Sequence, residues 1–163
     1  MEIRSRGIVI YRAPESKETT SEERKSADAR IISDLLTHIK CDDTQVKSFD
    51  RLGRFDSDRD NRGKHRPIKV RFSTNTERDK VLKNLFRLRD AEPPLKTLSI
   101  RQDLNDKQRE ELSKKLSEAY ELSKNSETLI YRVRGGPGDY KIKEFPRRPP
   151  NEEENNKPES LNG

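Results

Sequence analysis

Apolar residues recur in short runs along the chain, and turn-forming or charged residues separate the runs. The run over residues 7–11 holds β-branched and aromatic residues and is closed by a proline. It predicts a strand in the middle of a sheet, because such residues favour strands and proline cannot donate to a ladder. Since strand side chains alternate, we expect Ile8 and Ile10 on one face and Val9 and Tyr11 on the other. Three further strands are predicted over residues 46–52, 67–72 and 95–101.

Apolar positions at steps of three and four residues predict two helices between these strands. Thr20 and Glu23 fit a capping box, and so do Thr74 and Glu77. The order strand, helix, strand, strand, helix, strand is that of a ferredoxin-like, RNA-recognition-type sheet (βαββαβ), which we expect over residues 5–102. The predicted apolar stripes are Ile31, Ile32, Leu35, Leu36 and Ile39 in the first helix, and Val81, Leu82, Leu85 and Phe86 in the second.

A second, smaller domain is predicted over residues 103–146. A helix should begin near Asn105 and end at residues 124–126, and two alternating strands follow at residues 129–134 and 140–145. The glycine-rich segment between these strands predicts a hairpin. The fold class is therefore α+β, with a tail at residues 147–163 that we expect to be disordered because it has almost no apolar residues. The helix stripe is expected to hold Leu112, Leu116, Ala119 and Tyr120.

Composition adds a basic character to this picture. The 36 Lys and Arg residues exceed the 30 Asp and Glu residues, for a net charge of +6, and 40% of all residues are charged. A small core and an affinity for polyanions follow, although a solvated surface of mixed charge is the alternative. Cys41 is the only cysteine, so no internal disulfide forms and a reducing compartment is expected. The longest apolar run, residues 8–11, is too short for a membrane span, so we expect a soluble intracellular protein with no membrane partner.

Two surfaces are candidates for binding. The sheet face that the helices leave open would carry Val9, Tyr11, Lys69 and Arg71, and single-stranded RNA binds such faces. The aromatic positions that usually stack bases on the third strand hold Pro67 and Lys69 here. Phosphate contacts should therefore dominate, giving sequence tolerance and strong salt dependence. A solvated face without a ligand is the alternative.

The predicted hairpin is the second candidate surface. In a suitable register Arg132, Arg134, Lys141 and Lys143 would form one basic patch, while a merely soluble hairpin is the alternative. The segment between the second and third strands has a similar basic character, tempered by Asp56, Asp58 and Asp60. Its basic residues are Arg51, Arg54, Arg59, Arg62, Lys64 and Arg66.

The sequence contains no convincing motif for catalysis or for metal binding. Asp56, Asp58 and Asp60 alternate as in a calcium loop, but the sixth and twelfth positions hold Asn61 and Pro67 instead of glycine and glutamate. His38 and Cys41 lack the further ligands that zinc needs. No glycine-rich phosphate loop precedes a Lys-Ser/Thr pair. We therefore expect a binding module without enzymatic activity, cofactor or metal.

Four segments together resemble a known family: Gly-Ile-Val-Ile-Tyr-Arg-Ala-Pro-Glu-Ser at residues 7–16, Arg-Leu-Gly-Arg at 51–54, Arg-Pro-Ile-Lys-Val-Arg-Phe at 66–72 and Ile-Arg-Gln-Asp-Leu at 100–104. Their order and spacing resemble the first-open-reading-frame protein of LINE-type non-LTR retrotransposons. In that family an RNA-recognition-like domain is followed by a small helix-and-hairpin domain, and the cleft between them holds the strand. Many members also carry an N-terminal coiled coil or zinc knuckles, which this chain lacks, so we expect any self-association to depend on a segment absent from it.

The resemblance implies sequence-tolerant binding of single-stranded RNA and DNA, packaging of the element's RNA in a cytoplasmic and also nuclear ribonucleoprotein, and strand-annealing chaperone activity. It places nucleic-acid contacts at Arg109 and Tyr131, whereas strand alternation places Tyr131 beside Val133, on the inward side. A protein-interaction module, or an inactive fragment of an endonuclease and reverse-transcriptase element, is the alternative. The candidate nucleic-acid-contacting residues are Tyr11, Arg12, Arg51, Arg54, Lys69, Arg71, Arg101, Arg109, Tyr131, Arg132, Arg134, Lys141 and Lys143.

Overall fold

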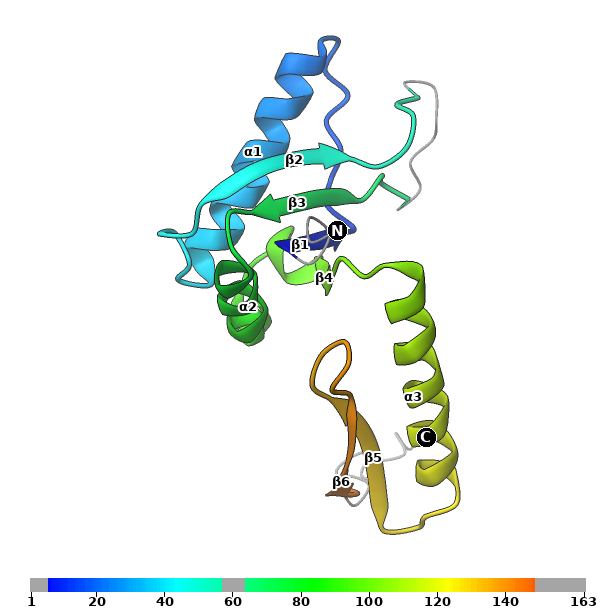
Figure 1. Cartoon of the computed structure of the whole chain (residues 1–163). Helices are drawn as coiled ribbons and strands as arrows, with labels where there is room; N and C mark the ends of the chain where they lie inside the picture. The colour runs from blue at the N-terminus through cyan, green and yellow to red at the C-terminus, as the bar shows by residue number, and fades with distance from the viewer. Residues whose placement is uncertain (1–5, 57–63, 149–163) are drawn as a thin grey trace, which may run out of the picture. The chain divides into compact units, whose positions relative to one another are not determined.

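The computed structural model describes residues 6–56 and 64–148. These residues form an α+β structure with three α-helices, a four-stranded antiparallel sheet and a separate hairpin (Figure 1). The chain divides into two compact units, residues 1–105 and 106–163. Residues 149–163 of the predicted disordered tail, and Asp58, Asp60 and Asn61 of the tested calcium pattern, lie outside the described residues.

The first unit contains the four-stranded sheet. Its strands are β1 (Gly7–Tyr11), β2 (Val46–Arg51), β3 (Ile68–Phe72) and β4 (Ser99–Gln102). They lie in the order β2-β3-β1-β4, with β2 at one edge, and each neighbouring pair is antiparallel (Figure 1). The helices are α1 (Ser21–His38) and α2 (Asn75–Asn84), and the 3-10 helices η2 (Leu85–Asp90) and η3 (Leu95–Thr97) lead into β4.

Both predicted capping boxes are confirmed. The Thr20 hydroxyl accepts from the Glu23 amide at 3.3 Å, and the Glu23 carboxylate accepts from the Thr20 amide at 3.3 Å. Thr74 and Glu77 do the same at the start of α2, at 3.2 and 2.9 Å. These side chains satisfy amides that have no partner within the helix, so each helix begins where its sequence specifies.

The core lies between the sheet and the two helices. Strand alternation places Ile8 and Ile10 of β1 in this core, as predicted, and Ile68, Val70 and Phe72 of β3 lie beside them. The helices contribute mainly Ile32, Leu35, Leu36 and Val81. Because both helices pack on one face, the residues of opposite parity occupy the other face of the sheet.

Two predictions about the first unit are wrong in detail. Phe86 was expected on the buried stripe of α2, but it is 60% exposed because α2 ends at Asn84 and the chain continues as the 3-10 helix η2. A 3-10 helix has three residues per turn, so the α-helical spacing no longer selects one face. The fourth strand was expected from residue 95, yet residues 95–97 form η3 and pairing begins at Ser99.

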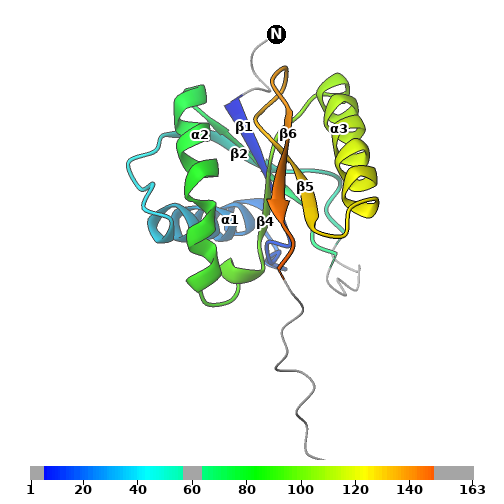
Figure 2. The same ribbon diagram turned by 90° about the horizontal axis from the view of Figure 1, so that it is seen from below.

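The second unit consists of α3 (Asp106–Lys124) and a hairpin of β5 (Leu129–Arg134) and β6 (Lys141–Pro146). Figure 2 shows the two strands side by side, with α3 next to β5. The Ser123 hydroxyl joins helix and strand, since it donates to the Ala119 carbonyl at 2.7 Å and accepts from the Tyr131 amide at 2.8 Å.

The turn of the hairpin depends on a glycine. Gly135 has a φ of +96°, and a Cβ at this position would lie 2.3 Å from the Asp139 carbonyl oxygen. Only glycine fits both conditions. This glycine lets the chain turn tightly at the end of β5. The first pair of the two strands next to the turn is Arg134 opposite Lys141.

The stripe predicted on α3 is wrong for two of its members. Ala119 is buried, but Leu116 is 52% exposed and Tyr120 is 66% exposed. A single hairpin covers a narrower strip of the helix than a sheet would, so the flank of the stripe stays in solvent. No helix in the described parts of the chain is long and apolar enough to cross a membrane.

Candidate nucleic-acid interface

The hairpin register gathers four predicted cations on one face. Arg132 pairs with Lys143, and Arg134 pairs with Lys141. Directly paired residues on antiparallel strands project from the same face, about 4.5–5.5 Å apart at Cβ. Lys141 lies 3.3 Å from the carboxylate of Asp139, but both side chains are about 70% exposed, so this pair screens little of its charge. These four residues, together with the cross-strand pair Ile130 and Phe145, are called the hairpin face below.

Phe145 lies among these cations, and the sequence prediction missed it. The Arg134 guanidinium carbon is 5.2 Å from the centroid of the Phe145 ring, and that of Arg132 is 5.7 Å away. Both distances fall in the range of cation–π attraction. Strand alternation in the sequence could have placed it there, because Lys141, Lys143 and Phe145 occupy every second position of β6 and therefore share one face.

The opposite face of the hairpin is turned toward α3. A pocket of about 470 Å³ lies there, lined by Glu118 and Leu122 of α3 and, on the hairpin, by Tyr131, Ile142 and Glu144 of this face and by Lys143 of β6. Tyr131 pairs with Glu144, so its ring stands beside a carboxylate. Alternation therefore predicted the position of Tyr131 correctly. The contact implied by the family resemblance requires a ligand to enter this pocket.

In the first unit, the sheet face opposite the helices carries a second group of predicted residues. Arg101 lies over the ring of Tyr11, 5.7 Å from its centroid, and Tyr11 is 40% exposed. Val9 separates Lys69 and Arg101 across the central strand. Tyr11, Arg101, Lys69 and Arg71 are called the sheet face below.

The cations of the sheet face differ in how far they are already neutralised. Lys69 lies 2.7 Å from the Asp103 carboxylate, and both side chains are largely buried. Asp103 can fold over the strand because Gly7 has no side chain, and a Cβ there would be 3.2 Å from that of Asp103. Arg71 is half-buried and has no acidic partner among the described residues. Arg71 and Arg101 therefore supply most of the available positive charge on this face.

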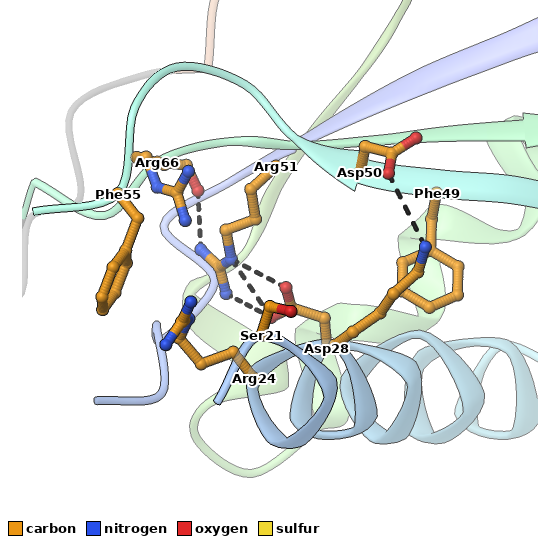
Figure 3. A pocket seen from close by; sticks show the side chains of 9 residues that line it. Ser21, Arg24, Asp28, Phe49, Asp50, Arg51, Phe55 and Arg66 are labelled. Atoms are coloured by element: carbon orange, nitrogen blue, oxygen red, sulfur yellow. Dashed lines mark hydrogen bonds and ion pairs between the residues drawn. The ribbon is translucent and has the colours of Figure 1, made fainter. Parts of the chain in front are cut away.

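Arg51 was predicted to contact nucleic acid, but the structure gives it a different position. It pairs with Ile68 in the register, which places it on the helix side of the sheet, and its side chain is only 5% exposed. Figure 3 shows it reaching from β2 to Asp28 on α1. Its Nε lies 3.0 Å and its Nη2 2.6 Å from Asp28 oxygens.

The remaining donors of Arg51 bind backbone carbonyls. Nη1 donates to Ala13 at 3.0 Å and to Arg66 at 2.6 Å, and Nη2 donates to Pro14 at 2.6 Å. All five guanidinium N–H groups therefore have acceptors. A side chain that is buried and fully bonded cannot also reach a phosphate, so we assign Arg51 to the fold and leave it out of the proposed interface.

A pocket of about 240 Å³ opens beside Arg51, between α1 and β2 (Figure 3). Its cations already have partners: Arg24 donates to the carbonyls of Glu18 and Thr19 at 2.7 and 2.9 Å, and its guanidinium lies 3.9 Å from the ring centroid of Phe55. Arg66 donates to Glu15 through Nε at 2.7 Å. Burial alone would raise the pKa of Glu15, but the Arg66 hydrogen bonds and charge outweigh it and lower that pKa. We assign this cluster to the fold as well.

The other predicted residues lie outside both faces. Arg12 and Arg54 are exposed in segments that follow β1 and β2, and Arg12 has a φ of +62°. Arg109 is in the first turn of α3, 3.5 Å from Asp106. Cys41 is buried, and burial raises the pKa of its thiol, which disfavours the reactive thiolate. The described residues contain no group of three side chains suited to hold a metal.

No protein-family model matches the chain and no curated protein matches it, so what these surfaces bind has to follow from their own chemistry.

Proposed function

We propose that the protein binds single-stranded RNA and DNA with little sequence preference, and that the hairpin face is its main contact. The observation that carries this proposal is the register that places Arg132, Arg134, Lys141 and Lys143 together on one face. Four clustered cations attract a polyanion and release its counterions on binding. Phosphates are the same in every sequence, so such contacts do not discriminate between bases.

The sheet face supports the same proposal in the first unit. An antiparallel sheet with the order β2-β3-β1-β4 and both helices on one face is the arrangement expected for an RNA-recognition-type domain. Tyr11 and Arg101 offer a ring and a guanidinium on the side of the sheet opposite the helices. Because Lys69 is already paired with Asp103, we propose a smaller contribution from this face than from the hairpin.

The biological setting is a further part of the proposal. The motif order that resembles the LINE-type proteins suggests a component of a retrotransposon ribonucleoprotein with nucleic-acid chaperone activity. Sequence-tolerant binding is compatible with that role, because packaging and strand annealing both require contact with many different sequences. The proposed locations are the cytoplasm and the nucleus.

The test is fluorescence anisotropy with a labelled oligonucleotide of about 30 nucleotides at several salt concentrations. The full chain should bind with a log-log salt slope of several units that is similar for unrelated sequences. The double variant Lys141→Ala and Lys143→Ala should weaken binding and reduce the slope by about 2, or about 1 per lysine.

A matched control removes the same charge from another surface of the same unit. Lys107 and Lys114 are exposed on α3, and Lys114 is 3.0 Å from Glu110. The double variant Lys107→Ala and Lys114→Ala should change the slope by less than the hairpin variant does. Equal effects of the two variants would mean that net charge alone drives binding, and absence of binding at low salt would refute the proposed function.

A further inference from the structure

The surroundings of Phe145 differ from those of a residue that only packs against an apolar core. It is half-buried on the hairpin face, directly across from Ile130, and two guanidinium groups lie within 5.7 Å of its ring centroid. The face turned toward α3 is the other one, which holds Tyr131 and Ile142. Contact with α3 therefore does not account for an aromatic ring at this position.

We propose that Phe145 is a base-stacking site, so that the hairpin face takes unpaired nucleotides in preference to paired ones. This inference rests on the proposed function and adds to it the residue that recognises the base. An aromatic ring flanked by cations offers both halves of a nucleotide a partner, since bases stack on rings while phosphates bind Lys and Arg. Stacking tolerates every base, because each has a π-face.

The proposed site extends along the hairpin over three successive cross-strand pairs. Ile130 and Phe145 form one cross-strand pair, Arg132 and Lys143 the next, and Arg134 and Lys141 the last before the turn. The apolar pair thus occupies one end of the backbone register, while the guanidinium groups of Arg132 and Arg134 reach back to the Phe145 ring. A strand lying along the hairpin can place a base over Phe145 while its neighbouring phosphates reach the cations.

The selectivity follows from what a duplex hides. In a duplex the faces of the bases are stacked on one another, so the ring of Phe145 has no base to contact unless a base is unstacked. The phosphates of a duplex remain accessible to Arg132, Arg134, Lys141 and Lys143. The proposal therefore separates two contributions: a salt-dependent one shared by all nucleic acids, and a ring-dependent one restricted to unpaired bases.

The experiment compares Phe145→Leu with the unchanged full chain on three probes. These are a single strand of about 30 nucleotides, the matching duplex, and a strand of the same length with a run of abasic sites. Phe145→Leu should weaken binding of the single strand by about 5- to 140-fold, the equivalent of about 1–3 kcal/mol per stacked base. Binding of the duplex and the abasic strand should change less than about twofold, with the salt slopes unaltered.

Two further variants keep the test decisive. Phe145→Tyr retains a ring and should retain single-strand affinity. Tyr120→Leu is the matched control, because Tyr120 is a 66% exposed ring of the same unit with no cation over it among the described residues, and it should leave binding unchanged.

Three results would overturn the inference. Phe145→Leu could equal the Tyr120→Leu control, it could weaken all three probes alike, or Phe145→Tyr could lose as much affinity as Phe145→Leu. In each case salt-dependent binding by the unchanged chain would still support the proposed function. If the unchanged chain bound none of the probes, both the function and the stacking site would be rejected.

Discussion

Replacing Arg51 by methionine separates two roles that this side chain can have, contact with nucleic acid and support of the fold. Methionine has a similar length and no charge. In the structure the guanidinium joins Asp28 on α1 to the carbonyls of Ala13, Pro14 and Arg66. It thus connects α1, the segment after β1 and the segment before β3. We expect Arg51→Met to destabilise the first unit and leave nucleic-acid affinity unchanged as long as the unit stays folded.

The magnitude follows from the burial of the pair. The Arg51 and Asp28 side chains are 5% and 10% exposed, so solvent cannot replace a lost partner. Removing one member of a buried ion pair costs about 3–5 kcal/mol, because the other charge is left unpaired. Folding free energies are about 5–15 kcal/mol for a whole domain. The variant should therefore retain only part of the stability of the first unit.

The assay is urea denaturation followed by circular dichroism. With a slope of about 1.5 kcal/mol per M, a loss of about 3–5 kcal/mol lowers the midpoint by about 2–3 M. Adding Asp28→Leu should recover part of the loss, because the double variant leaves no buried charge without a partner. Arg101→Met is the matched control on the sheet face, and we expect it to lower the affinity while shifting the midpoint by less than about 0.5 M.

The reasoning would be refuted by the opposite pattern. If Arg51→Met kept its urea midpoint and lost affinity as Arg101→Met does, Arg51 would be a nucleic-acid contact, as its sequence neighbourhood first suggested.

Three further predictions concern the first unit. Because the pKa of Glu15 is lowered in the folded state, its contribution to stability is present above the unfolded pKa of about 4.3 and is lost as the pH falls through the folded pKa. The urea midpoint should therefore depend less on pH, between about pH 6 and pH 3, in Glu15→Gln than in the unchanged protein. Cys41 is buried with a raised thiol pKa, so alkylation at pH 8 should be much slower in native protein than in urea, and equal rates would contradict its burial. Thr20→Ala removes a capping box and should lower the free energy of unfolding by about 1 kcal/mol in the same urea assay, whereas Thr19→Ala, one residue earlier, should have little effect.

Local patterns predicted most of the elements, because the rules behind them act over a few residues. The alternation around Ile8 and Ile10 and both Thr and Glu capping boxes depend only on strand geometry and on helix ends. The start of β4 and the exposure of Phe86 could not be predicted in this way. Both depend on 3-10 helices whose formation is set by how the chain packs between Asn84 and β4.

The candidate site shows a different limit. Phe49 packs against the core and Arg51 follows two residues later on β2, so strand alternation places Arg51 on the helix side as well. The basic composition of the neighbouring segment suggested a nucleic-acid contact instead. No local pattern could identify its partner Asp28, which is 23 residues away. For Phe145 the parity with Lys141 and Lys143 was available, but the pairing with β5 was needed to place Arg132 and Arg134 near its ring.

Gly135 carries no charge and touches no proposed ligand, yet the identity of the hairpin face depends on it. The close approach of the Asp139 carbonyl at this turn fixes which residues of β5 and β6 are opposite one another. A shift of one residue on one strand turns its side chains to the other face. Replacing Gly135 with another uncharged residue would thus move the two cations of one strand to the opposite face of the hairpin without altering the net charge of the protein. A related sequence that lost binding in this way would keep all of its charged residues, and it would differ at the turn glycine instead.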